Sequence, residues 1–184
     1  MIAATRLRGG NANSARGAAG FTAQAVGTAR DAGCSGIVVV RADSAFYSAA
    51  FTGAVRAAGA FFSVTVQMNP HVKAAIAAIG EDAWTPIRYP RAIWDEQLRC
   101  WVSDAEVAEI PYTAFTSKKP QAITARLIVR RVRDLNPKAG TRPDELFCLW
   151  RYHAIFTDSP FEMIIPSLNG RVSNVHHERP HLPG

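Results

Sequence analysis

The chain has 184 residues, of which 48% are hydrophobic, and its 21 Lys and Arg against 15 Asp and Glu give a net charge of +6. This length and apolar fraction suit one domain with a hydrophobic core, or one domain with a small subdomain. There is no long apolar run, no signal-peptide pattern and no closely spaced cysteine pair. These absences argue against a membrane span, a secreted protein, a disulfide framework and a thiolate zinc site, so we expect a cytoplasmic protein.

The surplus of positive charge comes mostly from arginine. A guanidinium group pairs with phosphate through two parallel hydrogen bonds, so nucleic acid leads acidic metabolites as the expected partner. Heavy use of arginine codons in a GC-rich genome would produce the same surplus without any partner.

The first elements in chain order are a basic loop and a helix. Residues 6–14 (RLRGGNANS) form the loop, whose glycines lack the GxxxxGK[ST] and GxGxxG spacings of nucleotide-binding loops. A helix is expected over about 15–32, capped by Ser14 and ended at Gly33. Its apolar face would consist of Phe21, Ala25, Val26 and Ala29.

A strand, a helix and a second strand follow. Four β-branched residues run without a break from Ile37 to Val40, which predicts a strand over 36–42 that is buried on both faces of a sheet. A helix over about 45–58 and a strand over 61–67 complete a βαβ unit with parallel strands. Asn69 and Pro70 then start a short helix that reaches about residue 79.

Asp43 closes the first strand of this unit. Open α/β sheets carry their chemistry at the carboxyl ends of their strands, so Asp43 is a candidate catalytic or metal-binding residue. An aspartate in this position is also a good N-cap for the helix that follows. The residues themselves leave both roles open.

Short strands replace helices in the next part of the chain. They are expected over 84–89, 92–94, 97–102, 106–115 and 123–131, which predicts an antiparallel β subdomain. A loop over 134–144 separates them from a strand over 145–157 that rejoins the first sheet. From about residue 164 no apolar periodicity remains, and we expect a loosely packed or disordered tail.

Four segments carry a family resemblance: RLRGGNANS at 6–14, VVVRADSAFY at 38–47, AITARLIVRR at 122–131 and WRYHAIFTD at 150–158. Together they resemble bacterial insertion-sequence transposases of the DDE type, in the group with a β-rich insert between the second and third catalytic acids. The resemblance implies an α/β fold in which a partial ribonuclease-H-like core, the βαβ unit, carries an antiparallel β-rich insert. The core would span 1–80, the insert 81–145, a returning strand 146–163 and an unstructured tail 164–184.

The resemblance also implies a chemistry. In this family three acidic residues hold two divalent metal ions, usually Mg²⁺, which activate the attacking group and stabilise the leaving oxygen of a phosphodiester. Asp43 matches the second of the three acids. The implied substrate is DNA at transposon ends, and the implied setting is the nucleoid in the bacterial cytoplasm.

Two departures from the family pattern shape the expectation. The first acid should precede the 6–14 loop, and the third, a Glu, should lie on a helix after Asp158, yet neither is found. Glu178 does not replace the third acid, because Pro180 and Pro183 disfavour a helix there. We therefore expect a transposase fragment that is truncated at both ends, with a frameshift near residue 163, and that is inactive alone. The alternatives are a non-catalytic basic domain that binds DNA or full-length transposase, and a small α/β enzyme that uses Asp43 alone.

Other candidate residues have a structural and a functional interpretation. Arg126, Arg130, Arg131 and Arg133 would contact DNA phosphates, or would form the charged face of an edge strand. Four tryptophans would stack on bases or, more simply, pack in the core. The histidines of the tail, His176, His177 and His181, have a loose metal-like spacing, but a surface tail explains them better.

Overall fold

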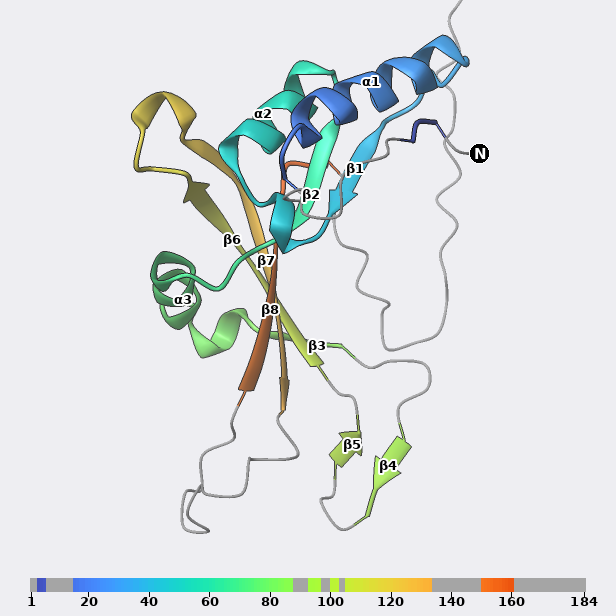
Figure 1. Ribbon diagram of the computed structural model, residues 1–184. Helices are drawn as coiled ribbons and strands as arrows, with labels where there is room; N and C mark the ends of the chain where they lie inside the picture. Colours follow the sequence, from blue (N-terminus) through green and yellow to red (C-terminus); the bar gives the residue numbers. More distant parts are fainter. Residues whose placement is uncertain are drawn as a thin grey trace, which may run out of the picture.

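The computed structural model describes residues 3–5, 15–87, 93–96, 100–102, 105–133 and 150–160. These residues build a six-stranded sheet in the order β1-β2-β8-β7-β6-β3, and a two-stranded ribbon of β4 and β5 (Figure 1). The helices are α1 (Ala18–Asp31), η1 (Ser44–Phe46), α2 (Ala49–Ala57), α3 (Pro70–Ala77), η2 (Glu81–Ala83) and η3 (Lys119–Gln121), where η denotes a 3-10 helix. The strands are β1 (Val39–Ala42), β2 (Phe61–Thr65), β3 (Thr85–Ile87), β4 (Ile93–Asp95), β5 (Cys100–Val102), β6 (Ala105–Ala114), β7 (Ile123–Arg133) and β8 (Trp150–Thr157).

Helix α1 occupies most of the range predicted for it. Its buried residues are Ala18, Thr22 and Val26, so the inward face is rotated from the predicted one, of which only Val26 is buried. The N-cap is Gly17, which makes no side-chain cap; the predicted cap, Ser14, lies outside the described residues. Gly33 adopts a left-handed φ of 91° just after the helix, as expected of a glycine that ends one.

The predicted βαβ unit is present. Strands β1 and β2 are parallel neighbours, with Val40 beside Phe62 and Ala42 beside Val64. The helix between them is shorter than predicted, because the chain first makes η1 and then begins α2 after Ser48, whose hydroxyl accepts the amide of Phe51. A hydroxyl in the N-cap position competes with the continuous helix that the apolar spacing suggested.

Strand β1 lies at the edge of the six-stranded sheet in the described part of the chain. Among the described residues it pairs only with β2, three of its four residues are half-buried and the fourth is exposed. Ile37, just before it, is 55% exposed. The prediction of a strand buried on both faces was therefore wrong for this structure, because an unbroken apolar run reports hydrophobicity but not the number of neighbouring strands.

The strands predicted after residue 84 are all present and mostly antiparallel. Strand β8 pairs with β2 on one side and with β7 on the other, so it rejoins the first sheet as predicted and also continues into β7, β6 and β3. The long β6–β7 hairpin runs beside it. One continuous sheet therefore contains both the βαβ unit and the strands that follow it.

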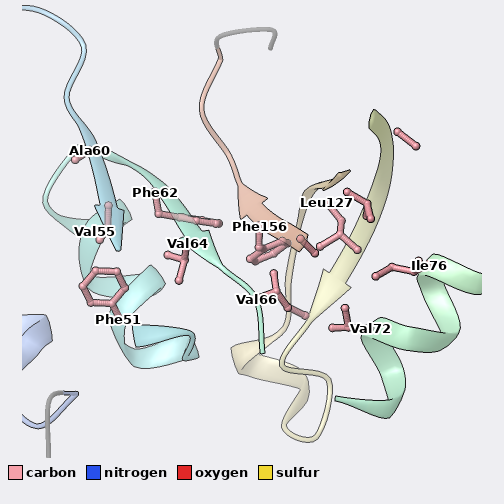
Figure 2. Packing of buried hydrophobic residues seen from close by; sticks show 14 of the residues in the cluster. Phe51, Val55, Ala60, Phe62, Val64, Val66, Val72, Ile76, Leu127 and Phe156 are labelled. Carbon is pink, nitrogen blue, oxygen red and sulfur yellow. The ribbon is translucent and has the colours of Figure 1, made fainter. Parts of the chain in front are cut away.

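One apolar cluster joins the three α-helices to the sheet. Phe156 of β8 lies at its centre, fully buried, with its ring 5.1 Å from that of Phe62 (Figure 2). Val64 and Leu127 are its cross-strand neighbours on the same face. Helix α3 adds Val72 and Ile76, as predicted from its sequence. The helices therefore cover one face of the sheet, which we call the covered face.

The opposite face bears no helix within the described ranges and is called the open face. Strand alternation places on it a small buried cluster of Ile87, Val107 and Ile128, among polar side chains. No helix in this part of the chain has the length and apolarity needed to span a membrane. The predicted 6–14 and 134–144 loops and the 164–184 tail, with its histidines and Glu178, lie outside the described residues.

Candidate functional site

Asp43 lies at the carboxyl end of β1, exposed to solvent. Its Oδ1 accepts a hydrogen bond of 2.9 Å from the amide of Ala45, so it caps η1 rather than α2. The capping role considered for this residue is thus real, but it occupies one carboxylate oxygen only. Within the described residues, the second oxygen has no hydrogen-bond partner and is available for another contact.

A hollow of about 300 Å³ adjoins this carboxylate; we call it the Asp43 hollow. Strands β1 and β2 supply most of its lining, because Arg41 of β1 lies directly beside Ser63 of β2 in the parallel register, and β8 adds Ile155. Side chains two residues apart in extended chain share a face, which places Asp43 with Arg41, and Thr65 with Ser63. The residues that line the hollow are Arg41, Ala42, Asp43, Ser63, Thr65 and Ile155.

The described residues do not fit a two-metal centre at this position. No group of three His, Cys, Asp or Glu side chains able to hold a metal ion occurs among them. The other acid in the segments that resemble transposases is Asp158, which lies beside Phe62 of β2. Asp43 instead follows Ala42, which lies beside Val64 of β2. About three residues of strand, or roughly 10 Å, separate the two levels. Asp43 is therefore a lone carboxylate in this part of the structure.

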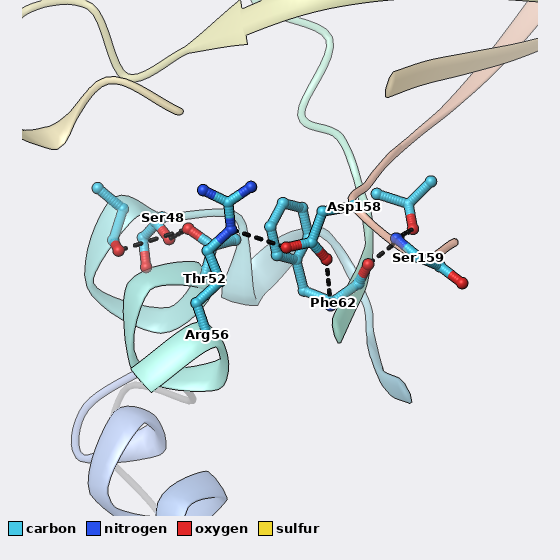
Figure 3. Close-up of polar contacts among 8 residues, drawn as sticks. Ser48, Thr52, Arg56, Phe62, Asp158 and Ser159 are labelled. Carbon is cyan, nitrogen blue, oxygen red and sulfur yellow. Dashed lines mark hydrogen bonds and ion pairs between the residues drawn. The ribbon is translucent and has the colours of Figure 1, made fainter. Parts of the chain in front are cut away.

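Asp158 has a structural task instead. Its carboxylate accepts hydrogen bonds of 2.7 Å from Arg56 Nε and from the amide of Phe62 (Figure 3). The hydroxyl of the preceding Thr157 donates to the carbonyl of Phe62 at 2.7 Å. These contacts hold the end of β8 against β2 and α2, next to the apolar cluster around Phe156.

Arg126 and Arg130 project from β7 onto the open face, because Leu127 and Val129 between them are buried on the covered face. Arg126 binds the carboxylate of Glu109 at 3.1 Å, and it also donates to the carbonyl of Ser159. Arg130 is half-buried opposite His153 of β8. Arg133 ends the strand, and its side chain lies outside the described part.

Arg131 lies on the covered face and is only 5% exposed. It binds Glu81 at 2.7 Å and Glu106 through Nε, while the rings of Trp84 and Trp150 lie 4.2 and 4.4 Å from its guanidinium carbon. These five residues form what we call the Arg131 cluster. Its hydrogen bonds to Glu81 and Glu106 raise the pKa of Arg131 and lower that of Glu81.

The tryptophans divide between two environments. Trp84 and Trp150 pack against Arg131, in agreement with the simpler prediction of core packing. Trp94 of β4 is 45% exposed, and the side chain of Trp101 lies outside the described residues.

Sequence reasoning did not single out Arg41, Ser63 or Thr65. The signal was available, because Arg41 precedes Asp43 by two residues on an extended segment and so shares its face. The two hydroxyl residues could be added only once the register of β2 against β1 was known.

The chain matches a known protein family. A family described as "Transposase DDE domain group 1" matches residues 1–138 of the 184, a stretch that contains Asp43 and runs through the end of β7. No curated protein matches the chain.

Proposed function

The chain belongs to the family of transposase DDE domains, and on that basis we propose that it is part of an enzyme that cuts DNA at transposon ends and joins it to a target. The match over residues 1–138 is the observation that carries this proposal. We propose Asp43 as one of the acidic residues of the catalytic centre. Its exposed position at the carboxyl end of a parallel strand supports this role.

We also propose that the chain does not cleave DNA by itself. The family uses divalent metal ions, and two ions need several carboxylates to hold them. The Asp43 hollow offers one carboxylate within the described residues. The remaining acids would have to come from elsewhere, and a full-length transposase is the partner that we propose to supply them.

For DNA contact we propose Arg126, Arg130 and Arg133 of β7. Arg126 and Arg130 share the open face, and no helix covers that face in the described structure. Arg131 is left out of this set, because two carboxylates and two indole rings already enclose its guanidinium group. Phosphate contacts of this kind give affinity without sequence preference.

The domain arrangement that we propose is a ribonuclease-H-like part over 1–80, completed by the strand in 146–163, with 81–145 as an insert. The pairing of β8 with both β2 and β7 supports it, since this strand joins the two parts of the sheet. We propose that the protein is encoded by a bacterial insertion sequence and acts in the nucleoid.

A nicking assay tests the proposal. The purified chain and its Asp43→Asn variant are incubated with supercoiled plasmid in Mg²⁺ or EDTA, and binding to a fluorescent duplex is measured at low salt. We expect both proteins to bind DNA and neither to nick it. Mg²⁺-dependent nicking that Asp43→Asn removes would contradict the proposed inactivity. Absence of DNA binding at low salt would contradict the proposed substrate.

A further inference from the structure

Arg41 differs from the other arginines of the sheet whose side chains the structure describes. It is exposed, it lines the Asp43 hollow, and its guanidinium makes no hydrogen bond or ion pair in the part of the chain that the structure describes. Four other arginine side chains bind groups of the same chain. Arg30 binds the carbonyls of Cys34 and Gly36, Arg56 binds Asp158, Arg126 binds Glu109, and Arg131 binds Glu81 and Glu106.

The surroundings of Arg41 suit a phosphate group. The hydroxyls of Ser63 and Thr65 lie on the same face of the neighbouring strand and are able to donate to phosphate oxygens. Ser63 is half-buried and Thr65 is exposed, so the hollow is open to a ligand from solvent. Its volume of about 300 Å³ is at the lower end of the range for ligand sites, which fits one small charged group rather than a base pair.

Electrostatics gives Arg41 a specific task. A phosphodiester that approaches Asp43 meets a carboxylate of the same sign, and this repulsion disfavours contact. Arg41 is the cationic residue that lines the hollow with Asp43. A guanidinium at this position offsets the repulsion and fixes the phosphate through two parallel hydrogen bonds.

We propose that Arg41, assisted by the hydroxyls of Ser63 and Thr65, binds one phosphodiester of a DNA strand beside Asp43. This inference rests on the proposed function, which supplies DNA as the ligand. It adds a residue that holds the substrate backbone at the candidate catalytic carboxylate. The arginines of β7 would then serve the same DNA farther along the open face.

Salt-dependent binding of a fluorescent 30-base-pair duplex to the full chain tests this contact. Each phosphate contact contributes about 0.9 to the slope of log K against log salt concentration. We expect Arg41→Gln to lower that slope by about one and the affinity at 100 mM salt by about tenfold. Arg41→Lys should keep the slope, because the charge remains, but bind more weakly than wild type, because a point charge lacks the paired hydrogen bonds.

Lys73→Gln is the matched control, since Lys73 is exposed on α3, which packs on the covered face, and the substitution removes the same charge. We expect its slope to equal that of the wild type. A wild-type slope in Arg41→Gln would overturn the Arg41 contact and leave the proposed function standing. Absence of binding by the wild-type chain at low salt would overturn both, and an equal fall in slope for Lys73→Gln would show a non-specific charge effect and overturn the Arg41 contact.

Discussion

The Arg131 cluster and the Asp43 hollow combine arginine with carboxylate in opposite ways. In the cluster, Arg131 is 5% exposed, and its guanidinium group has two carboxylate partners and two indole rings around it. In the hollow, Arg41 and Asp43 share one face of one strand, both are exposed, and no ion pair joins them among the described contacts. The same two residue types thus make a closed arrangement at one place and an open one at the other.

The difference follows from burial. A charge withdrawn from water must be paired within the protein, or the fold loses several kcal/mol. The residues around Arg131 meet that requirement, so the cluster has no capacity left for a ligand. The charges in the hollow are hydrated and need no internal partner. They are therefore free to bind a group from outside, and the hollow rather than the richer cluster is the candidate site.

The largest effect that we expect comes from Arg131→Gln. The substitution removes two ion pairs and two contacts between the guanidinium group and indole faces. Because Glu81 and Glu106 keep access to water, their orphaned charges cost less than fully buried ones. We expect the free energy of unfolding in urea to fall by about 2–3 kcal/mol.

Arg41→Gln provides the contrast within the same measurement. An exposed side chain without an internal partner should change the free energy of unfolding by less than about 0.5 kcal/mol. The comparison would fail if the two substitutions had similar effects on stability. A loss below about 1 kcal/mol for Arg131→Gln would likewise mean that the cluster contributes little to the fold.

A smaller effect is expected from pH at the same cluster. The hydrogen bond from Arg131 lowers the pKa of Glu81 from its ordinary value of 4.5. The ionised carboxylate is thus favoured in the folded state, so its contribution is complete above pH 4.5 and is lost as pH falls below that value. Because Glu81 is 81% exposed, we expect the contribution to be smaller than the loss in Arg131→Gln.

Glu81→Gln isolates that contribution from the other carboxylates. The difference in free energy of unfolding between wild type and variant, measured from pH 7 to pH 3, should be constant at neutral pH and shrink below about pH 4.5. A difference that does not change with pH would contradict the ion pair with Arg131.

Local sequence patterns predicted most of the secondary structure. The β-branched run before Asp43 and the Asn69–Pro70 start of α3 are local signals, and each marks an element that the structure contains. The parallel pairing of β1 with β2 followed from the short helix between them. These features depend on residues that are close in sequence, which is why one sequence suffices to predict them.

Contacts between distant residues were not predictable in the same way. Glu81 lies 50 positions before Arg131 in the chain and yet binds it at 2.7 Å. Nothing in the sequence around Arg131 indicates this contact. Arg131 therefore looked like its neighbours on a charged strand face. In the Asp43 hollow, the sequence predicted Asp43 from its place at a strand end. It did not predict that Ser63 and Thr65 lie beside it, because that depends on the register between β1 and β2.

Substitutions at Asp43 are also expected to have small effects, and they separate its two roles. Asp43→Ala removes the bond to the amide of Ala45 and should lower the free energy of unfolding by about 0.5–1 kcal/mol. Asp43→Asn keeps a capping oxygen, so its stability in urea should stay within about 0.5 kcal/mol of wild type. The Asn variant nevertheless loses the charge that faces the incoming phosphate. In EDTA it should therefore bind the fluorescent duplex more tightly than wild type, although it folds equally well. Unchanged affinity would mean that no phosphate approaches Asp43, and the hollow would then be only a polar surface beside a helix cap.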